Sequence, residues 1–268
     1  MSTALVPDRL VLPDGGTLAY GVFGAGSPLL LVPGLGGLAD AWAPMLPALA
    51  RRFSVVLHDH RGTGASSRCD RPYSVGSIAA DVLALMDHLG IASAALVGHS
   101  TGGAVGQHVA LHAPTRLSRL VLSASWARSC AYMRRLFALR LLVLDRLGSA
   151  AHRELSDLVL APPWWTAAQP EPPSAWAETT LDVEIVRRRI GAVLAHDTQD
   201  ALDRITLPVL VITALDDAVV PPAHSAGIAR DIPGARLAEL PQGGHLIART
   251  RTERYLAEIE AFLSEPPA

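Results

Sequence analysis

The sequence predicts an α/β protein with a mostly parallel central sheet, flanked by helices, and a helical insertion. Short apolar runs rich in Val, Leu and Ile alternate with longer amphipathic segments. This alternation is typical of a parallel sheet covered by helices on both faces. The alternation stops after Ser123 and strand-like sequence resumes at Leu207, so the stretch between them is expected to be an insertion in the sheet.

Short apolar runs predict the strands of the sheet. Strands buried on both faces should be short and continuously apolar, and five runs fit this description: Leu29–Val32, Ser54–Leu57, Ala94–Val97, Leu120–Leu122 and Val209–Thr213. Residues 9–24 predict two earlier strands that meet at the turn Asp14-Gly15-Gly16. A further strand-like run, Arg236–Leu240, precedes the last helical segment.

Helical periodicity predicts two groups of helices. Within the sheet domain, amphipathic segments occupy 39–51, 76–89 and 100–113. Helical patterns without strands between them follow at 131–147, 149–159 and 175–195, and a segment rich in Pro and Trp separates the last two. We therefore expect a core domain formed by 1–125 and 201–268, with a helical cap at 126–200.

Length and charge limit the functional class. A chain of 268 residues suits one large domain, or one domain with an insertion, and half of its residues are hydrophobic. Lys and Arg number 23 against 25 Asp and Glu, for a formal net charge of −2. A nucleic-acid-binding protein needs a basic surface. We expect a small-molecule substrate and no nucleic acid partner, in a monomer or homodimer.

The remaining composition predicts a cytoplasmic protein. The two cysteines, Cys69 and Cys130, do not imply a disulfide framework and are expected to be free thiols in a reducing compartment. The first ten residues, MSTALVPDRL, lack the basic start and long apolar stretch of a signal peptide. Every apolar run is interrupted before the ~20 residues that a membrane-spanning helix needs. No membrane association is expected.

The strongest chemical motif is Gly98-His99-Ser100-Thr101-Gly102, where a buried strand runs directly into a helix. A turn this tight strains the serine backbone, and small neighbours avoid a collision. The strain raises the hydroxyl above the sheet, and the N-terminus of the helix favours a developing anion. We predict Ser100 as a nucleophile.

A serine hydroxyl needs a general base, and the order of elements selects His245 from ten histidines. Gly243-Gly244-His245 follows the last strand-like run and precedes the last helix. The base is oriented by a carboxylate that lies between the serine and the histidine in the chain. Asp216 and Asp217, which follow the strand 209–213, are both candidates.

An oxyanion hole is expected beside the serine, made of backbone N–H groups aimed at the developing charge. One donor should be Thr101, the residue after the nucleophile. The other should come from the glycine-rich loop Pro33-Gly34-Leu35-Gly36-Gly37, with Leu35 as the donor. The spacing of these glycines matches neither a dinucleotide-binding motif nor a P-loop.

These motifs, joined by Asp59-His60-Arg61-Gly62-Thr63-Gly64-x-Ser66, resemble the α/β-hydrolase superfamily over essentially the whole chain. Within it, the acid loop and the segment Arg134–Phe137 are similar to those of bacterial 3-oxoadipate enol-lactonases and aminoacrylate hydrolases. The resemblance implies the α/β-hydrolase fold, Asp217 as the acid, no metal and no organic cofactor, and a structural role for the turn 59–66. A serine nucleophile argues against haloalkane dehalogenases and epoxide hydrolases, which use aspartate at this position.

The expected function is hydrolysis of an ester or lactone of a small to medium, largely apolar substrate through an acyl-enzyme. Trp126, Trp164, Trp165 and Trp176 lie in the expected cap, where they either line the substrate pocket or attach the cap to the core. Arg128, Arg134, Arg135 and Arg140 either bind a substrate carboxylate or lie on solvated faces. From these two groups we assign Trp126, Trp164, Trp165 and Arg128 to the substrate-binding site. Two alternatives stay open, a C–C bond hydrolase, perhydrolase or lyase with the same triad, and a receptor with slow turnover.

Overall fold

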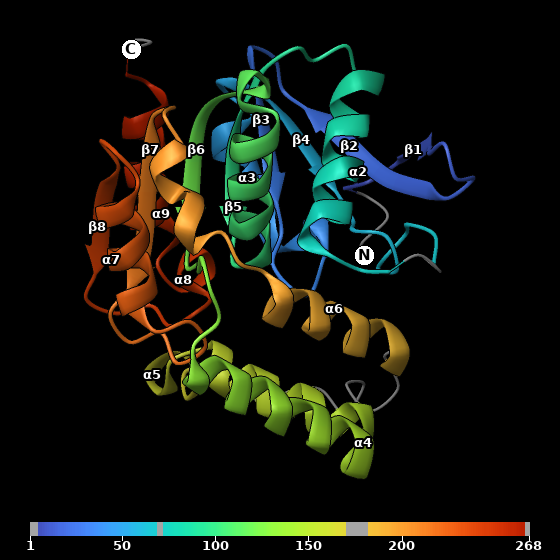
Figure 1. Cartoon of the computed structure of the whole chain (residues 1–268), viewed down its shortest axis with the longest axis vertical. Helices are drawn as coiled ribbons and strands as arrows, with labels where there is room; N and C mark the ends of the chain where they lie inside the picture. Colours follow the sequence, from blue (N-terminus) through green and yellow to red (C-terminus); the bar gives the residue numbers. More distant parts are fainter. Residues whose placement is uncertain (1–4, 69–71, 170–181, 266–268) are drawn as a thin grey trace.

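The computed structural model describes residues 5–68, 72–169 and 182–265. Its centre is an eight-stranded sheet in the order β1-β2-β4-β3-β5-β6-β7-β8. The pairs β1·β2 and β2·β4 are antiparallel, and every other pair is parallel. The predicted α/β architecture with a mostly parallel sheet is therefore confirmed (Figure 1).

All of the predicted strands are present, with bounds that differ by a few residues. The strands are β1 (Asp8–Val11), β2 (Thr17–Phe23), β3 (Ser27–Val32), β4 (Phe53–His58), β5 (Ala94–His99), β6 (Leu117–Ser123), β7 (Val209–Ala214) and β8 (Arg236–Leu240). The early hairpin turns where it was predicted to turn, because Gly15 adopts a φ of 82° and Leu12 N–H donates to Gly16 O at 2.8 Å.

Helices cover both faces of the sheet. They are α1 (Leu46–Leu49), α2 (Val75–His88), α3 (Thr101–His112), α4 (Ala131–Leu160), α5 (Pro163–Thr166), α6 (Val183–Ala195), α7 (Pro222–Asp231), α8 (Ile247–Thr250) and α9 (Thr252–Leu263). Figure 1 shows α4, α5 and α6 grouped at one end of the sheet, away from the helices on its faces.

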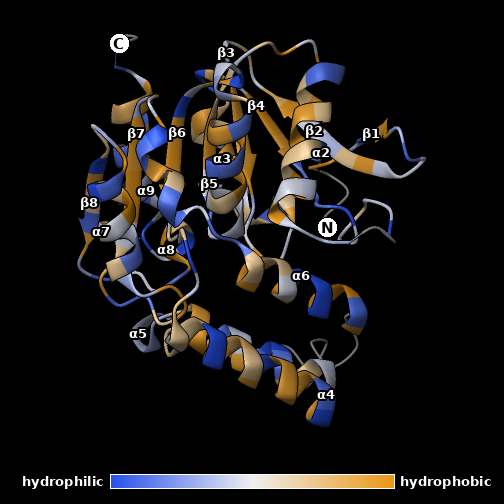
Figure 2. Cartoon of the chain, viewed as in Figure 1, coloured by the Kyte–Doolittle hydropathy of each residue, from blue (hydrophilic) through white to orange (hydrophobic). Residues whose placement is uncertain are grey.

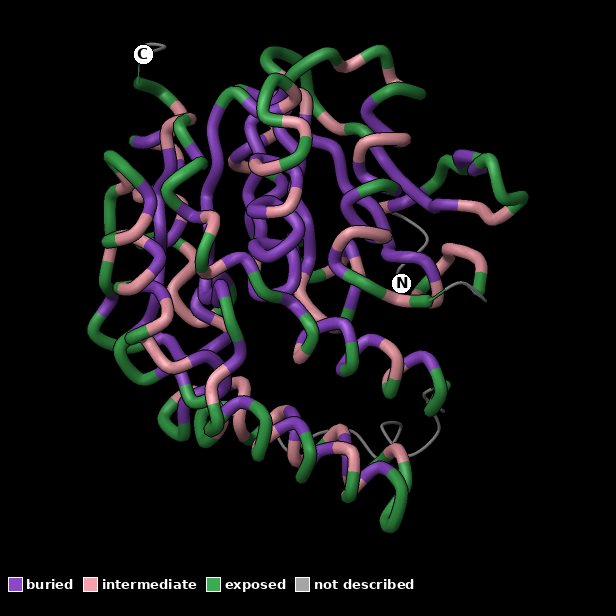
Figure 3. The backbone as a smooth tube through the Cα atoms, in the orientation of Figure 1, coloured by how far each residue is buried: buried purple, intermediate pink, exposed green. Residues whose placement is uncertain are grey.

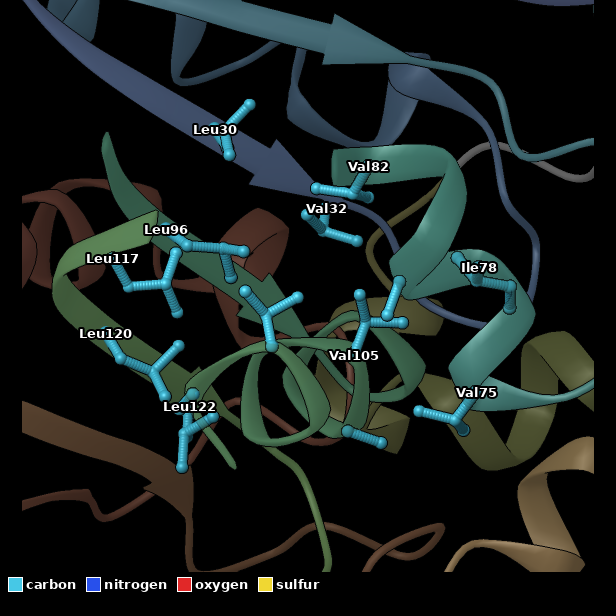
Figure 4. Close-up of a cluster of buried hydrophobic side chains, with 14 of the residues drawn as sticks. Leu30, Val32, Val75, Ile78, Val82, Leu96, Val105, Leu117, Leu120 and Leu122 are labelled. Carbon is cyan, nitrogen blue, oxygen red and sulfur yellow. The ribbon is translucent and has the colours of Figure 1, made fainter. Parts of the chain in front are cut away.

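The strands supply two separate apolar cores because successive side chains point to opposite faces. On β3, Leu30 and Val32 join the core under α2, α3 and α7, whereas Leu29 and Leu31 join the core under α1 and α9. The central strands are apolar in Figure 2 and buried in Figure 3. Figure 4 shows part of the first core, in which Val32 of β3, Leu96 of β5 and Val105 of α3 belong to one cluster. This two-sided burial explains why the central strands are continuously hydrophobic.

The prediction of one continuous helix over 39–51 was wrong. The segment forms a short 3₁₀ helix at Ala39–Trp42 and then α1. Pro44 and Pro47 account for the difference, since proline lacks the N–H for a helical hydrogen bond and clashes with the preceding turn. The break expected after residue 147 is present, because Gly148 interrupts α4 with a φ of 83°.

The third insertion helix, expected at 175–195, is described from Val183 onward. Asp182 caps it by accepting a hydrogen bond from Ile185 N–H at 3.1 Å. The part expected at 175–181, with Trp176, lies outside the described residues. Cys69 also lies outside them.

The two ends of the insertion are joined at the sheet. Thr198 N–H donates to Ala127 O at 2.9 Å, and Arg128 pairs with Asp197 in an isolated antiparallel bridge. The chain therefore leaves the sheet and returns to it at one place. The exact boundaries of a separate cap at 126 and 200 stay a prediction.

None of the helices that the structure describes has the length and hydropathy to cross a bilayer.

Buried histidines predict that acid destabilises the native state. Burial lowers the pKa of His58 to about 4, of His196 to about 4 and of His99 to about 3, from an ordinary 6.5. Between these pKa values and 6.5 the unfolded chain binds more protons, so the histidine contribution to the free energy of unfolding should be nearly constant between pH 7 and 8 and fall below pH 6.5. Each such histidine can contribute about 1.4 kcal/mol per pH unit.

Urea unfolding at pH 8, 6.5 and 5 measures this effect. The wild-type free energy of unfolding should decrease between pH 6.5 and 5, and His58→Asn should reduce the slope. A free energy of unfolding that stays constant over this range would contradict the prediction.

Candidate active site

The predicted catalytic side chains come together at the carboxyl ends of three parallel strands. Ser100 follows β5, Asp217 follows β7 and His245 follows β8. His245 Nε2 lies 3.0 Å from Ser100 Oγ, and His245 Nδ1 lies 2.8 Å from Asp217 Oδ2. Ser100 and Asp217 are each 6% exposed, and His245 is 4% exposed. The hydrogen-bonded chain that the three side chains form is therefore largely shielded from water.

The backbone at Ser100 is strained as the motif predicts. Its φ of 52° and ψ of −114° lie where a non-glycine residue costs about 1–3 kcal/mol. A Cβ on Gly98 would collide with the carbonyl oxygen of Gly102, and a Cβ on Gly102 would collide with that of Val32. Both positions therefore require glycine for the strand to turn directly into α3.

The structure separates the roles of the two neighbouring aspartates. Asp217 Oδ1 accepts from the N–H groups of Val219 and Val220 at 2.8 and 3.0 Å, which leaves Oδ2 to accept from His245. Asp216 Oδ1 instead accepts from the N–H groups of Gly243 and Gly244 at 2.8 and 2.7 Å. Asp217 contacts the imidazole, and Asp216 holds the loop on which the imidazole lies.

Two backbone segments border Ser100 where an oxyanion hole is expected. Thr101 is the first residue of α3, so no carbonyl within the helix accepts from its N–H. On the other side lies the loop of residues 33–37, hereafter the glycine loop. A Cβ on Gly34 would lie 3.3 Å from Ser100 Cβ, which places this loop directly against the serine.

A second histidine packs on the first. The rings of His99 and His245 have centroids 5.0 Å apart. Burial and then the neighbouring His245 lower the pKa of His99 to about 3. His99 is therefore neutral at physiological pH, and its ring packs beside His245 without adding a charge.

Helices of the insertion touch each loop that borders the site. Tyr132 of α4 donates its hydroxyl to Ala218 O in the acid loop at 2.6 Å. Leu160 O, at the end of α4, accepts from Leu246 N–H beside His245 at 3.1 Å. Arg189 of α6 donates from Nε to Leu35 O in the glycine loop at 2.8 Å. The geometry of the site thus depends on the position of the insertion.

The four side chains expected to bind substrate lie in different surroundings. Trp126 is 1% exposed and packs edge-on against His196. Trp164 and Trp165 lie under the guanidinium groups of Arg251 and Arg249, at 4.2 and 5.5 Å from the ring centres. These two contacts attach α5 to the segment that follows His245.

Arg128 is engaged at the protein surface. It donates to Asp197 and Asp200 at 2.6 Å each, and these hydrogen bonds raise its pKa above the ordinary value. Two of the other candidate arginines have protein partners: Arg134 binds Ser129 O at 2.7 Å and Arg140 binds Ser156 Oγ at 2.9 Å, whereas Arg135 is exposed on α4.

Sequence reasoning missed Arg189, although a signal was present. Ile185, Arg189 and Val193 follow one another at four-residue intervals, so the helical period places this arginine on the apolar face of α6. Ser125 was also missed; its hydroxyl donates to Ser100 O at 3.0 Å and supports the strained turn.

Metal binding has no support from the described side chains. His58 and His60 have ring centroids 5.2 Å apart, and both are buried. Within the described residues, no group of three or more His, Cys, Asp or Glu side chains could hold a metal ion. His60 instead belongs to the turn 59–66, in which its N–H donates to Gly37 O at 2.8 Å.

Comparison with known proteins agrees with this fold. Residues 27–142 match the α/β hydrolase fold family. A putative carbamate hydrolase, RutD, of Azorhizobium caulinodans is 35% identical over 252 residues, which cover 92% of this chain and 95% of that protein. A second, from a Caulobacter species, is 38% identical over 88% of this chain and 90% of its own length.

Solved structures give the same result. A hydrolase from Pseudomonas aeruginosa superposes with a TM-score of 0.86 at 32% identity, over 96% of this chain and 98% of that one. An enol-lactonase from Burkholderia xenovorans superposes with a TM-score of 0.86 at 26% identity, over 96% of this chain and 100% of that one. The chain therefore belongs to the α/β-hydrolase superfamily and is a hydrolase of that fold.

Proposed function

We propose that the protein is a serine hydrolase that cleaves an ester or lactone through an acyl-enzyme on Ser100. The observation that carries the proposal is the position of His245, 3.0 Å from Ser100 Oγ on one side and 2.8 Å from Asp217 Oδ2 on the other. A base between a hydroxyl and a carboxylate is the arrangement that activates serine as a nucleophile.

The mechanism follows from these contacts. His245 Nε2 takes the proton of the Ser100 hydroxyl as Oγ attacks the substrate carbonyl, and Asp217 stabilises the imidazolium. The N–H groups of Leu35 and Thr101 donate to the oxyanion of the tetrahedral intermediate. His245 then gives the proton to the leaving group. In the second half, His245 takes a proton from water, the hydroxide attacks the acyl carbon, and Ser100 Oγ regains its proton.

The surroundings of the site favour an apolar acyl group. Leu35 packs against the core under α2, α3 and α7, which also contains Trp126, Met133 and Phe137 from the insertion and Val220 from the acid loop. We propose that these four core residues form the wall of the acyl pocket, with Trp126 as its aromatic member. Because Arg128 is paired with two aspartates, recognition of a substrate carboxylate is not part of the proposal.

A carbamate is the second candidate substrate. The relatives from Azorhizobium caulinodans and Caulobacter are named putative carbamate hydrolases, at 35 and 38% identity. A carbamate presents the same carbonyl to Ser100 and forms the same type of tetrahedral intermediate. The two candidate substrates differ in the group that Ser100 carries in the covalent intermediate, which is an acyl group from an ester or lactone and a carbamoyl group from a carbamate. They also differ in the group that leaves.

A phosphonate ester and a substrate panel test the proposal. We expect a p-nitrophenyl phosphonate to modify one residue, Ser100, as identified by peptide mass spectrometry, and to abolish turnover in proportion to labelling. Aryl esters, lactones, aryl carbamates and amides of matched acyl size then identify the bond. Labelling at another residue, or a stoichiometric burst without steady turnover on every substrate, would contradict the proposal.

A further inference from the structure

Arg189 is a buried cation that the proposed chemistry does not yet use. It belongs to α6 of the insertion and is 4% exposed. Its Nε donates to Leu35 O at 2.8 Å, and its Nη2 lies 3.5 Å from Gly34 O and 3.1 Å from His60 Nδ1. Its charge is therefore directed at the backbone carbonyls of the glycine loop, immediately behind the expected oxyanion hole.

We propose that Arg189 is a positioning residue that holds the glycine loop so that the Leu35 N–H faces the oxyanion. The proposal rests on the proposed function, because it assigns Leu35 the role of an oxyanion donor. It adds that a helix of the insertion, and not the sheet alone, determines the direction of that donor.

The planarity of the peptide bond carries the argument. Gly34 C=O and Leu35 N–H belong to one trans peptide, so they point in opposite directions within one plane. Gly34 O faces Arg189 on one side and accepts from Gly37 N–H at 2.9 Å. The Leu35 N–H must then point away from Arg189. The 2.8 Å hydrogen bond from Arg189 Nε to Leu35 O restrains the next peptide, between Leu35 and Gly36, in the same way.

The charge of Arg189 strengthens the same donor. Burial lowers the pKa of Arg189 to about 10, which leaves the guanidinium protonated at neutral pH. Among the residues that the structure describes, no carboxylate lies within ion-pair distance of it. A cation on the carbonyl side of a peptide polarises that peptide and makes its N–H a stronger donor. The positive charge of Arg189 also favours a developing oxyanion nearby.

The surroundings restrict Arg189 to this position. Its guanidinium carbon lies 5.8 Å from the centre of the Tyr73 ring, and burial and the charge of Arg189 keep the pKa of His60 well below its ordinary value. A neutral His60 accepts through Nδ1, as the contact requires. Gly37 has a φ of 71°, and a Cβ there would lie 2.5 Å from Arg189 Nη2. Glycine at this position leaves room for the guanidinium.

Kinetics of Arg189→Met and Arg189→Lys test the inference. Methionine fills a similar volume without charge or donors, so kcat should fall about 30- to 100-fold while KM changes less than threefold. Lysine keeps the positive charge but cannot donate to Leu35 O and Gly34 O from two nitrogens of one planar group. The kcat of Arg189→Lys should therefore lie between the kcat of Arg189→Met and that of wild type. Arg188→Met is the matched control, because Arg188 lies on the same helix, pairs with Glu184 at 2.8 Å and should keep wild-type kcat.

A second measurement separates positioning from loss of structure. A boronic acid forms a tetrahedral adduct on serine and uses the oxyanion donors, whereas the alcohol product of an ester has no carbonyl or carboxylate oxygen to accept from them. Arg189→Met should weaken boronate binding by the same factor as kcat/KM and leave binding of the alcohol product unchanged. Equal weakening of both, or a kcat equal to that of wild type, would overturn the inference.

Gly37→Ala keeps the proposal testable if Arg189→Met does not fold. Its Cβ should displace the guanidinium and reproduce the loss of kcat and of boronate affinity. Gly234→Ala controls for backbone strain, since Gly234 has a φ of 73° with no atom within 4 Å of its Cβ position. If the wild-type protein shows no turnover that depends on Ser100, the proposed function is refuted. An active wild type with unchanged Arg189→Met and Gly37→Ala would refute the inference alone.

Discussion

Ser100→Ala is expected to lower kcat/KM for the best acyl substrate by about 10⁴-fold or more. The alanine variant has no nucleophile, and the activity that remains comes from substrate binding and the oxyanion donors alone. The Oγ of Ser100 has His245 Nε2 as its hydrogen-bond partner, and both groups lie in the site. The substitution should therefore leave the melting temperature nearly unchanged while it removes turnover.

Steady-state kinetics with an aryl ester, paired with thermal melting, measure this result. His245→Ala should cost about as much as Ser100→Ala, and the double variant should cost no more than either, since residues that act as one unit are not additive. Ser264→Ala, at the end of α9, is the control that removes a hydroxyl remote from the site. Wild-type turnover in Ser100→Ala would end the mechanism proposed above.

Asp217→Asn is expected to lower kcat by up to about 10⁴-fold, whereas Asp216→Asn should cost less than about tenfold. An amide at position 217 presents an N–H to His245 Nδ1, and this favours the tautomer that cannot take a proton from Ser100. At position 216 the amide oxygen still accepts from the N–H groups of Gly243 and Gly244, so the loop keeps its shape.

The pair of variants is a matched comparison, because the substitutions are identical and the positions adjacent. Asp216→Ala completes the series. It removes the acceptor of two N–H groups, so it should lower stability by about 1–3 kcal/mol and misplace the loop that carries His245. Equal losses of kcat in Asp217→Asn and Asp216→Asn would show that the assignment of the acid is wrong.

Much of the fold could be predicted from the sequence because its signals are local. A strand buried on both faces must be apolar throughout, which is why β3, β4, β5 and β7 could be recognised from composition. The strained turn at Ser100 needs small neighbours, so its motif also could be recognised. The prediction of a helix over 39–51 was wrong because the apolar periodicity was given more weight than Pro44 and Pro47, which a helix tolerates only in its first turn.

The arrangement of the site was less predictable because it depends on contacts between distant residues. Arg128 and Arg189 are both arginines of the insertion, and nothing in their identity distinguishes their roles. One is held at the surface by Asp197 and Asp200, and the other is buried against the glycine loop. The helical period indicated that Arg189 lies on an apolar face, but it could not indicate which loop that face meets.

By itself, the sequence determined the class of fold, the strained turn that carries Ser100, and the order of serine, acid and histidine along the chain. These follow from local backbone preferences and from the period of apolar residues. Local patterns left Asp216 and Asp217 both open, and the tertiary structure shows the contact of Asp217 with His245 that the resemblance implied. Only the tertiary structure decided that Arg189 reaches Leu35 from 154 residues away. Such choices depend on the direction of a side chain between two packed elements, which the folded chain alone defines.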